Sequence, residues 1–228
     1  MSMMGEFREI PEEVLDRLKA KPELVDSVVM ADLPSDDAVP GFEALVQAMP
    51  PKQREMMRAL QASMTPDERS RMLETSAQAA ASLKSMAAHF KSQAAGEAIA
   101  RDQLGERLSI EKAWHGVHYL LCGAADAAPG SLGQAILGGT EIGPDRGYGP
   151  ARYLTAQEVR EVAEGLSQVT KEVLLERYDP DTMDRLKVYP GHWSDPENRE
   201  WLTEAFADVL DFYTSVAARG NAVLLYLT

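Results

Sequence analysis

The C-terminal stretch, residues 194–227, restricts what the chain can fold into more than any other part of it. Ser194-Asp195-Pro196-Glu197 is typical of a helix start and Gly220 of a helix end. A continuous apolar run at residues 222–227 then predicts a strand that is buried on both faces. A long amphipathic helix beside such a strand favours an α+β fold. The helix is predicted from apolar residues at positions i, i+1, i+4 and i+5, namely Trp201, Leu202, Ala205, Phe206, Val209, Leu210, Tyr213 and Val216.

Short helices and strands are predicted on both sides of residues 42–107. Two proline-led helices follow an N-terminal strand, and a capping box, Thr155 to Glu158, begins a later helix. The fold class is therefore α+β, rich in helix, with a small mixed or antiparallel sheet. The predicted strands are 3–10, 151–154, 188–189 and 222–227, and the predicted helices begin at residues 11, 22, 110, 155, 170, 179 and 194, with a long glycine- and proline-rich connection over 123–150.

Residues 42–107 differ in composition from the rest of the chain. They follow a linker at residues 32–41 and are rich in Ala, Met, Gln, Ser, Arg and Glu. Helical spacing of small and apolar residues after Thr65-Pro66 predicts a long helix. We expect one domain over residues 1–228, with 42–107 as a helical insertion. The insertion either packs as a helical hairpin on the main core of the protein, which we favour, or forms a docking or dimerisation arm; the oligomeric state is left open.

The charge of the chain restricts its partners. Acidic residues outnumber basic ones 36 to 23, which gives a formal net charge of −13. This charge opposes binding to nucleic acid and to anionic membranes, and it would favour a basic protein partner. Cys122 is the single cysteine, so no intramolecular disulfide forms, and the N-terminus lacks the features of a signal peptide. We expect a cytoplasmic protein.

Several short stretches resemble the YfbM-like family of bacterial proteins, a domain of unknown function. The resemblance covers about residues 1–40 and 108–228, whereas residues 42–107 look longer than the family usually carries. It implies a small α+β fold and implies no activity, so it identifies no catalytic residues. The stretches are residues 3–7 (MMGEF), 111–118 (EKAWHGVH), 136–139 (ILGG), 147–154 (GYGPARYL) and 189–193 (YPGHW).

The predicted helix 110–122 carries a row of side chains that can bind metal ions. Glu111, His115, His118 and Cys122 are spaced four, three and four residues apart. The spacing is not that of zinc hydrolases, and four residues spread over more than two turns cannot all reach one ion. We expect His118 to hydrogen-bond a backbone group and His115 to pair with Glu111 in solvent. We predict no metal and no cofactor.

The adjacent face of this helix is predicted to be buried. Ile110, Trp114, Val117 and Leu121 repeat at intervals of four, three and four. Truncating Trp114 to alanine should therefore cost about 3–5 kcal/mol of stability. His115, one residue away, should tolerate the same change.

A glycine-rich loop over residues 138–152 is the second candidate site. Asp145, Arg146, Tyr148 and Arg152 offer charge and hydrogen bonds there, but the loop matches no phosphate-binding motif. The alternative is an ordered connection in which Arg152 bridges to a carboxylate at a helix start. The turn around Tyr189, His192 and Trp193 is a third cluster, with packing the more common role for such a group.

Two functions follow from these patterns. The first, which we favour, is a non-enzymatic protein-binding or interaction domain, of the immunity or regulatory type. The second is a small-molecule enzyme, a hydrolase or transferase, with a pocket around His115, His118, Arg146, Tyr148 and Arg152. Convergence in space separates the two, because an enzyme would gather these groups in one pocket with shifted pKa values. The ligand-binding candidates are His115, His118, Asp145, Arg146, Tyr148, Arg152, Tyr189 and His192.

Overall fold

The structure is a computed structural model that describes residues 2–32 and 98–228, together with Thr65, Arg71, Thr75 and Gln78. The chain divides into two compact units, Met1–Val28 with Ile99–Thr228, and Val29–Ala98. The predicted linker 32–41 and most of the predicted helical insertion 42–107 lie outside the described residues. The first unit contains every helix and strand discussed below.

The first unit is built on a five-stranded sheet in the order β2-β1-β5-β4-β3, in which all neighbouring strands are antiparallel. The C-terminal strand β5 lies in the middle, and all six of its residues pair with β1. This confirms the central buried strand and the α+β class. The strands are β1 (Gly5–Ile10), β2 (Arg107–Glu111), β3 (Thr140–Ile142), β4 (Ala151–Leu154) and β5 (Ala222–Leu227).

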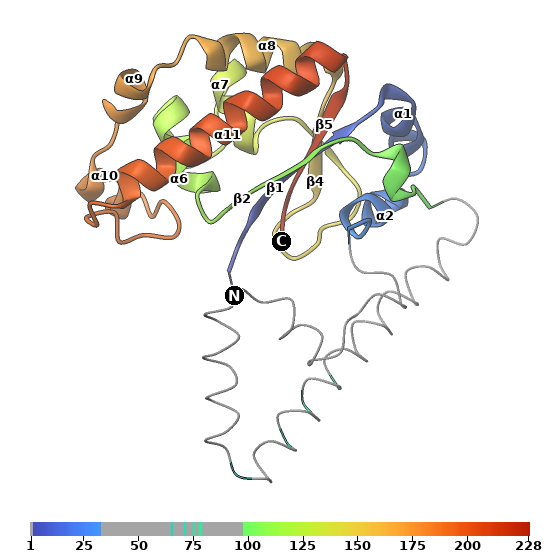
Figure 1. The fold of residues 1–228 in the computed structure, drawn as a ribbon, viewed down its shortest axis with the longest axis horizontal. Helices are drawn as coiled ribbons and strands as arrows, with labels where there is room; N and C mark the ends of the chain where they lie inside the picture. Colours follow the sequence, from blue (N-terminus) through green and yellow to red (C-terminus); the bar gives the residue numbers. More distant parts are fainter. Residues whose placement is uncertain (1, 33–64, 66–70, 72–74, 76–77, 79–97) are drawn as a thin grey trace. The chain divides into compact units, whose positions relative to one another are not determined.

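Helices cover both faces of this sheet. Phe7 packs against Phe212 and Tyr213 of α11, which places α11 on one face, and Figure 1 shows α6, α7 and α8 in the same layer. The other face meets α1, because Lys19 lies over the ring of Tyr153. The helices are α1 (Glu12–Ala20), α2 (Val25–Val29), α6 (Trp114–Cys122), α7 (Ser131–Leu137), α8 (Ala156–Ser167), α9 (Lys171–Leu175), α10 (Pro180–Arg185) and α11 (Asn198–Arg219), with short 3-10 turns at Pro22–Leu24 and Arg101–Gln103.

The predicted helix ends are largely confirmed. The Thr155 hydroxyl accepts a hydrogen bond from the Glu158 N–H, and the Glu158 carboxylate accepts one from the Thr155 N–H. Gly123 and Gly220 end α6 and α11 in the left-handed conformation that glycine adopts without steric cost. Thr170 and Asp179 cap α9 and α10 as expected.

Several predicted elements were wrong. Residues 107–111 form strand β2, so the helix predicted from residue 110 begins only at Trp114. The connection 123–150 contains helix α7 and strand β3, and residues 188–189 are not a strand. α11 begins at Asn198, after the predicted start signal. Short elements rich in glycine lack the periodicity on which such predictions depend.

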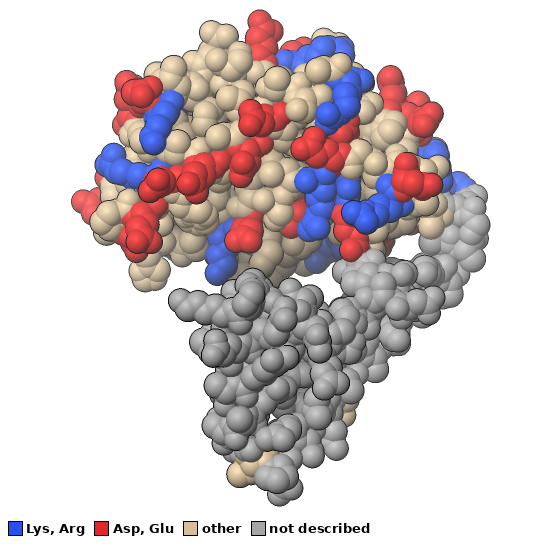
Figure 2. Space-filling view, in the orientation of Figure 1, with Lys and Arg blue, Asp and Glu red and all other residues tan. Residues whose placement is uncertain are grey.

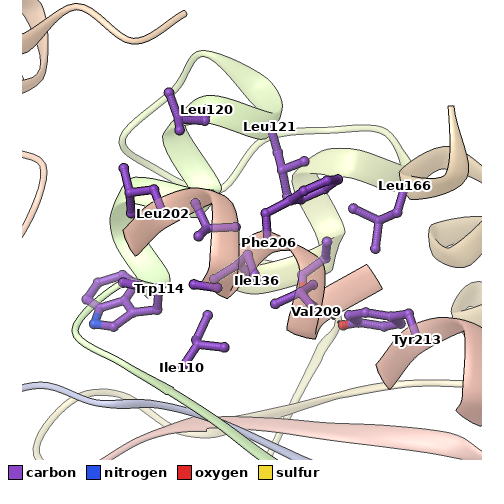
Figure 3. Packing of buried hydrophobic residues seen from close by; sticks show 14 of the residues in the cluster. Ile110, Trp114, Leu120, Leu121, Ile136, Leu166, Leu202, Phe206, Val209 and Tyr213 are labelled. Carbon is purple, nitrogen blue, oxygen red and sulfur yellow. Dashed lines mark hydrogen bonds between the residues drawn. The ribbon is translucent and has the colours of Figure 1, made fainter. Parts of the chain in front are cut away.

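The core lies between α6, α11 and the sheet, and Trp114 belongs to it. Trp114 is 5% exposed and lies near Leu202 and Phe206 of α11 in Figure 3, as the periodicity predicted. The chain leaves this unit and re-enters it at adjacent points, because the Ile99 N–H donates to Ser27 Oγ at 3.1 Å. None of the described helices is long and apolar enough to cross a membrane.

Candidate functional site

The imidazole of His115 joins α6 to the loop that follows it and to the distant turn at Tyr189. Its Nδ1 accepts a hydrogen bond from the Tyr189 N–H at 2.9 Å, and its Nε2 lies 2.7 Å from the carbonyl oxygen of Ala125. Because the first bond requires an unprotonated Nδ1, the proton sits on Nε2 and donates to Ala125. Burial lowers the pKa of His115 below its usual value. His115 is therefore neutral, hydrogen-bonded at both nitrogens, and not paired with Glu111 as predicted.

His118 occupies the next turn of α6 and has no exposed surface. Its Nε2 lies 2.9 Å from the Asp126 carbonyl oxygen, which can only accept, so Nε2 carries the proton. Its Nδ1 has no hydrogen-bond partner among the described residues. Burial lowers the pKa of His118, with a smaller contribution of the same sign from His115. The predicted hydrogen bond from His118 to a backbone group is confirmed.

Cys122 lies next to His118 but is not activated by it. The sulfur is 3.4 Å from Nε2 of His118, the nitrogen that already carries a proton, so this nitrogen cannot accept the thiol proton. The thiol donates instead to the His118 carbonyl oxygen at 3.1 Å. Glu111 lies on β2 rather than on the helix. Within the parts of the chain that the structure describes, no three acidic, histidine or cysteine side chains are grouped so as to hold a metal ion.

The Tyr189 turn is packed against α6 and the N-terminus. The Tyr189 ring stacks on Trp114, and its hydroxyl accepts a hydrogen bond from the Met3 N–H at 3.1 Å. Trp114 Nε1 donates to the Met3 carbonyl oxygen at 3.3 Å. His192 lies in the same turn with an exposed side chain and a φ of 62°. Tyr189 thus anchors the start of β1, while His192 faces solvent.

The loop before β4 is held by its own charged residues. One carboxylate oxygen of Asp145 accepts hydrogen bonds from the N–H groups of Gly147 and Gly149, at 2.7 and 3.1 Å. Arg146 forms an ion pair with Asp26 of α2. Asp145 therefore shapes the loop, and Arg146 attaches it to α2.

Tyr148 and Arg152 are brought together by the loop and β4. Both line a small hollow at one end of the sheet. Arg152 forms an ion pair with Glu141 of strand β3, with Nη2 and Oε1 3.7 Å apart, so the predicted partner at a helix start was wrong. The enzyme pocket predicted around His115, His118, Arg146, Tyr148 and Arg152 does not form. The histidine nitrogens bind backbone groups or lie buried, and Arg146 binds Asp26.

Three charged residues of β1 were not singled out from the sequence. Glu6, Arg8 and Glu9 are all at most 3% exposed. The Glu9 carboxylate accepts hydrogen bonds from both Arg219 and Asn221, at 2.6 to 2.8 Å, and from the Glu106 N–H at 2.9 Å. Burial raises the pKa of Glu9, but these hydrogen bonds outweigh it and hold the pKa below its usual value. The alternation of apolar and polar residues along β1 gave no sign that both faces of the sheet are covered.

An acidic row along α11 was also overlooked. Its members share the exposed side of the helix and are spaced three or four residues apart. Figure 2 shows acidic side chains in a row over α11. Among the residues that the structure describes, none forms an ion pair with a member of the row. The intervals of three and four residues between these acidic residues could have revealed the row from the sequence. The row consists of Glu197, the residue just before α11, and of Glu200, Glu204, Asp208 and Asp211 within it.

Comparison with known proteins places the chain in a family. It is similar in fold to the protein of unknown function YfbM from Escherichia coli, with a TM-score of 0.55 and 16% identity over 99% of both chains. No curated protein matches the chain in sequence. The sequence profile of the domain of unknown function DUF1877 matches residues 1–226, and thus runs through residues 42–107 as well. The chain belongs to the DUF1877 family.

Proposed function

We propose that the protein is a non-enzymatic binding domain that presents the acidic row of α11 to a basic protein partner. A role of the immunity or regulatory type would use such a surface. The observation that carries the proposal is the row itself, five carboxylates on one exposed side of a helix that is otherwise anchored in the core.

The row has the charge and rigidity that a basic partner requires. The other side of α11 is held by Leu202, Phe206 and Val209, which are at most 5% exposed, so the carboxylates are attached to a firmly packed element. Five like charges with no ion-pair partner among the described residues repel one another, and a basic partner relieves that repulsion and speeds association. The net charge of −13 acts in the same direction and opposes nucleic acid and anionic membranes.

The hydrogen bonding and burial of the two α6 histidines support a binding role over catalysis. A histidine that acts as a general base needs a free ring nitrogen that faces the substrate. Both ring nitrogens of His115 are hydrogen-bonded, one to the Tyr189 N–H and one to the Ala125 carbonyl oxygen. His118 has no exposed surface. These two residues, which most suggested an enzyme, serve the packing of α6 against its loops.

A photo-cross-linking experiment tests the proposal. Ala207 is exposed on α11 between Glu204 and Asp208, so a photoreactive amino acid placed there should form a covalent adduct with a basic protein in living cells. Ser167, exposed at the end of α8, is the matched control position and should give no such adduct.

Charge reversal distinguishes specific capture from random collision. Glu204→Lys with Asp208→Lys should abolish the adduct formed at residue 207. The same number of reversals at Glu161 and Glu164, which are exposed on α8, should leave it intact. Equal adducts at residues 207 and 167, or adducts that survive reversal of the row, would contradict the proposal.

A further inference from the structure

Strand β3 forms one edge of the sheet and has backbone groups to offer. Its three residues, Thr140–Ile142, pair with β4 on one side, and no described strand lies on the other. Outside that ladder, none of their backbone N–H or C=O groups bonds to a described residue. Because the backbone groups of a strand point alternately to its two sides, at least one N–H and one C=O face outward. Thr140 and Glu141 are exposed, so a further strand can approach this edge.

The opposite edge of the sheet, β2, is less suited to such pairing. Its register with β1 shifts between Gly5 and Glu6, and Glu111 at its end has a φ of 47°. Irregularities of this kind bend an edge strand and interrupt the regular spacing of its backbone groups. The pairing of β3 with β4 runs without a shift. Of the two edges of the sheet, β3 is therefore the one that can accept another strand.

An open cleft of about 440 Å³ lies beside β3 on the sheet face that meets α1. Thr140 shares this face, because its register partner is Tyr153, whose ring lies under the Lys19 ammonium. That ammonium is 4.0 Å from the Asp16 carboxylate, too far for a hydrogen bond, and the Lys19 side chain is 41% exposed. The cleft thus offers a positive charge beside apolar surface, and its lining includes Lys19, Pro22, Ile142 and Pro150.

Glu141 places a negative charge on the other face of the same edge. It also borders the cleft, but its register partner is Arg152, which pairs in turn with Leu225 on the α11 face of the sheet. The Glu141 side chain is 65% exposed, and Arg152 Nη2 lies 3.7 Å from its carboxylate, too far for a hydrogen bond. Glu141 can therefore accept hydrogen bonds from a second cation.

We propose that β3 accepts an extended segment of another protein, which adds a strand to the sheet. Running antiparallel, as all neighbours in this sheet do, the segment presents in order an apolar, a basic and an acidic residue. These stand opposite Ile142, Glu141 and Thr140, where the acidic side chain reaches Lys19 over the cleft. Apolar and oppositely charged pairs across two strands stabilise their pairing, and the backbone bonds supply the rest.

A second copy of this chain fits the edge less well than another protein. Symmetric antiparallel pairing of two β3 strands sets one Glu141 against the other, and like charges directly opposite each other destabilise a strand pair. The edge is also separate from the acidic row of α11, and neither surface depends on the role proposed for the other.

NMR titration of the full chain with the peptide acetyl-Thr-Val-Lys-Glu-Val-Thr-amide tests the proposal. The peptide should give saturable shifts of the amide signals of β3 and none along β2. Exchanging its Lys and Glu keeps the composition but opposes like charges at both positions, so the Kd should rise at least about 3-fold. The double variant Lys19→Glu, Glu141→Lys should reverse this preference. The control swap Glu164→Lys, Lys171→Glu, at exposed positions elsewhere, should leave it unchanged.

Backbone pairing is tested separately from charge. A peptide methylated on the backbone nitrogens of its first Val, its Lys and its Glu lacks the N–H groups that donate to β3, so it should not bind. The absence of saturable shifts at β3, equal binding of the methylated peptide, or equal binding of the two charge orders would overturn the proposal. Shifts at β3 that depend on protein concentration without peptide would assign the edge to a second copy instead.

Discussion

The imidazoles of His115 and His118 are close on the same side of α6, yet each is used to hold a loop. Their Nε2 atoms donate to the carbonyl oxygens of neighbouring residues, Ala125 and Asp126. His115 also stacks on Trp114, with ring centroids 4.6 Å apart. The two side chains thus clamp the loop after α6, and His115 extends the clamp to the turn at Tyr189.

Substitutions at residues 114 and 115 should both destabilise the protein, for different reasons. Trp114→Ala leaves a cavity in the core and should cost about 3–5 kcal/mol. His115→Phe keeps the stacked ring but leaves the Tyr189 N–H and the Ala125 carbonyl group without their partner, which should cost about 1–3 kcal/mol. Urea unfolding measures both changes, and His192→Ala, at an exposed position, is the control.

This differs from the prediction that His115 would tolerate substitution. The backbone partner expected for His118 is present. Helical periodicity correctly placed Trp114 in the core, but His115, which was expected in solvent, is half-buried and stacks on Trp114. It could not show that Tyr189, which is 74 residues away in sequence, would reach His115. Stability unchanged by His115→Phe would show that the two hydrogen bonds contribute nothing.

At the scale of elements, α6 and α11 approach closely because residue 116 is glycine. A Cβ atom there would lie 2.7 Å from both Leu202 Cδ2 and Trp193 Cη2. Replacing glycine by alanine inside an exposed helix normally stabilises it by about 1 kcal/mol. In α6 the added methyl group should instead force the helices apart.

Gly116→Ala should therefore cost about 1–3 kcal/mol in thermal or urea unfolding, as overpacking does elsewhere. Leu202→Ala removes the side chain that the new methyl group meets. In a double-mutant cycle the two changes together should cost less than the sum of their separate effects, by at least about 0.5 kcal/mol. Additive effects, or a stabilised Gly116→Ala variant, would show that the helices do not meet there.

The elements differ in how well their sequences predicted them. Thr155 with Glu158, Gly123 and Gly220 carry local signals, because a cap or a left-handed residue depends on its immediate neighbours. The end of strand β2 was assigned to a helix, since Ile110 fits the spacing of the apolar residues that follow it in α6. Helix α7 and strand β3 span seven and three residues, too few to show a period.

For the whole molecule, the buried titratable groups should make stability depend on pH in two steps. The pKa values of His115 and His118 are lowered from 6.5, so the unfolded chain takes up protons below that pH while the folded chain does not. The free energy of unfolding should therefore fall from about pH 6.5 downward. The groups that face these imidazoles are the carbonyl oxygens of Ala125 and Asp126, the Asp126 carboxylate, the Cys122 thiol and the Tyr189 N–H.

Glu9 adds the second step at lower pH. Its pKa is lowered from 4.5, so its contribution is complete above that pH and is lost as the pH falls toward the lowered value. Urea unfolding across pH 3 to 8 measures both steps. Glu9→Gln should remove the lower step, and His115→Phe should reduce the upper one. If the free energy of unfolding stayed constant or increased as the pH was lowered from 7 to 5, the two buried histidines would not be neutral.

The acidic row of α11 shows the limit of sequence at this scale. The net charge was evident, and the spacing of Glu200, Glu204 and Asp208 placed them on one side of a helix. Whether counter-ions surround them depends on which elements fold nearby. The nearest basic residues in sequence are otherwise occupied, because Arg199 lies over Tyr178 and Arg219 binds Glu9.

Selection of peptides from a random display library tests the binding role of the row most directly. The wild-type protein should enrich peptides rich in Lys and Arg, and binding should weaken steeply as the salt concentration rises. Reversal of Glu200, Glu204 and Asp208 to lysine should abolish that enrichment. Reversal of Glu161 and Glu164 on α8 and of Glu176 just after α9, which are equally charged and exposed, should preserve it. Peptides without basic residues, or equal losses in both triple variants, would contradict the account.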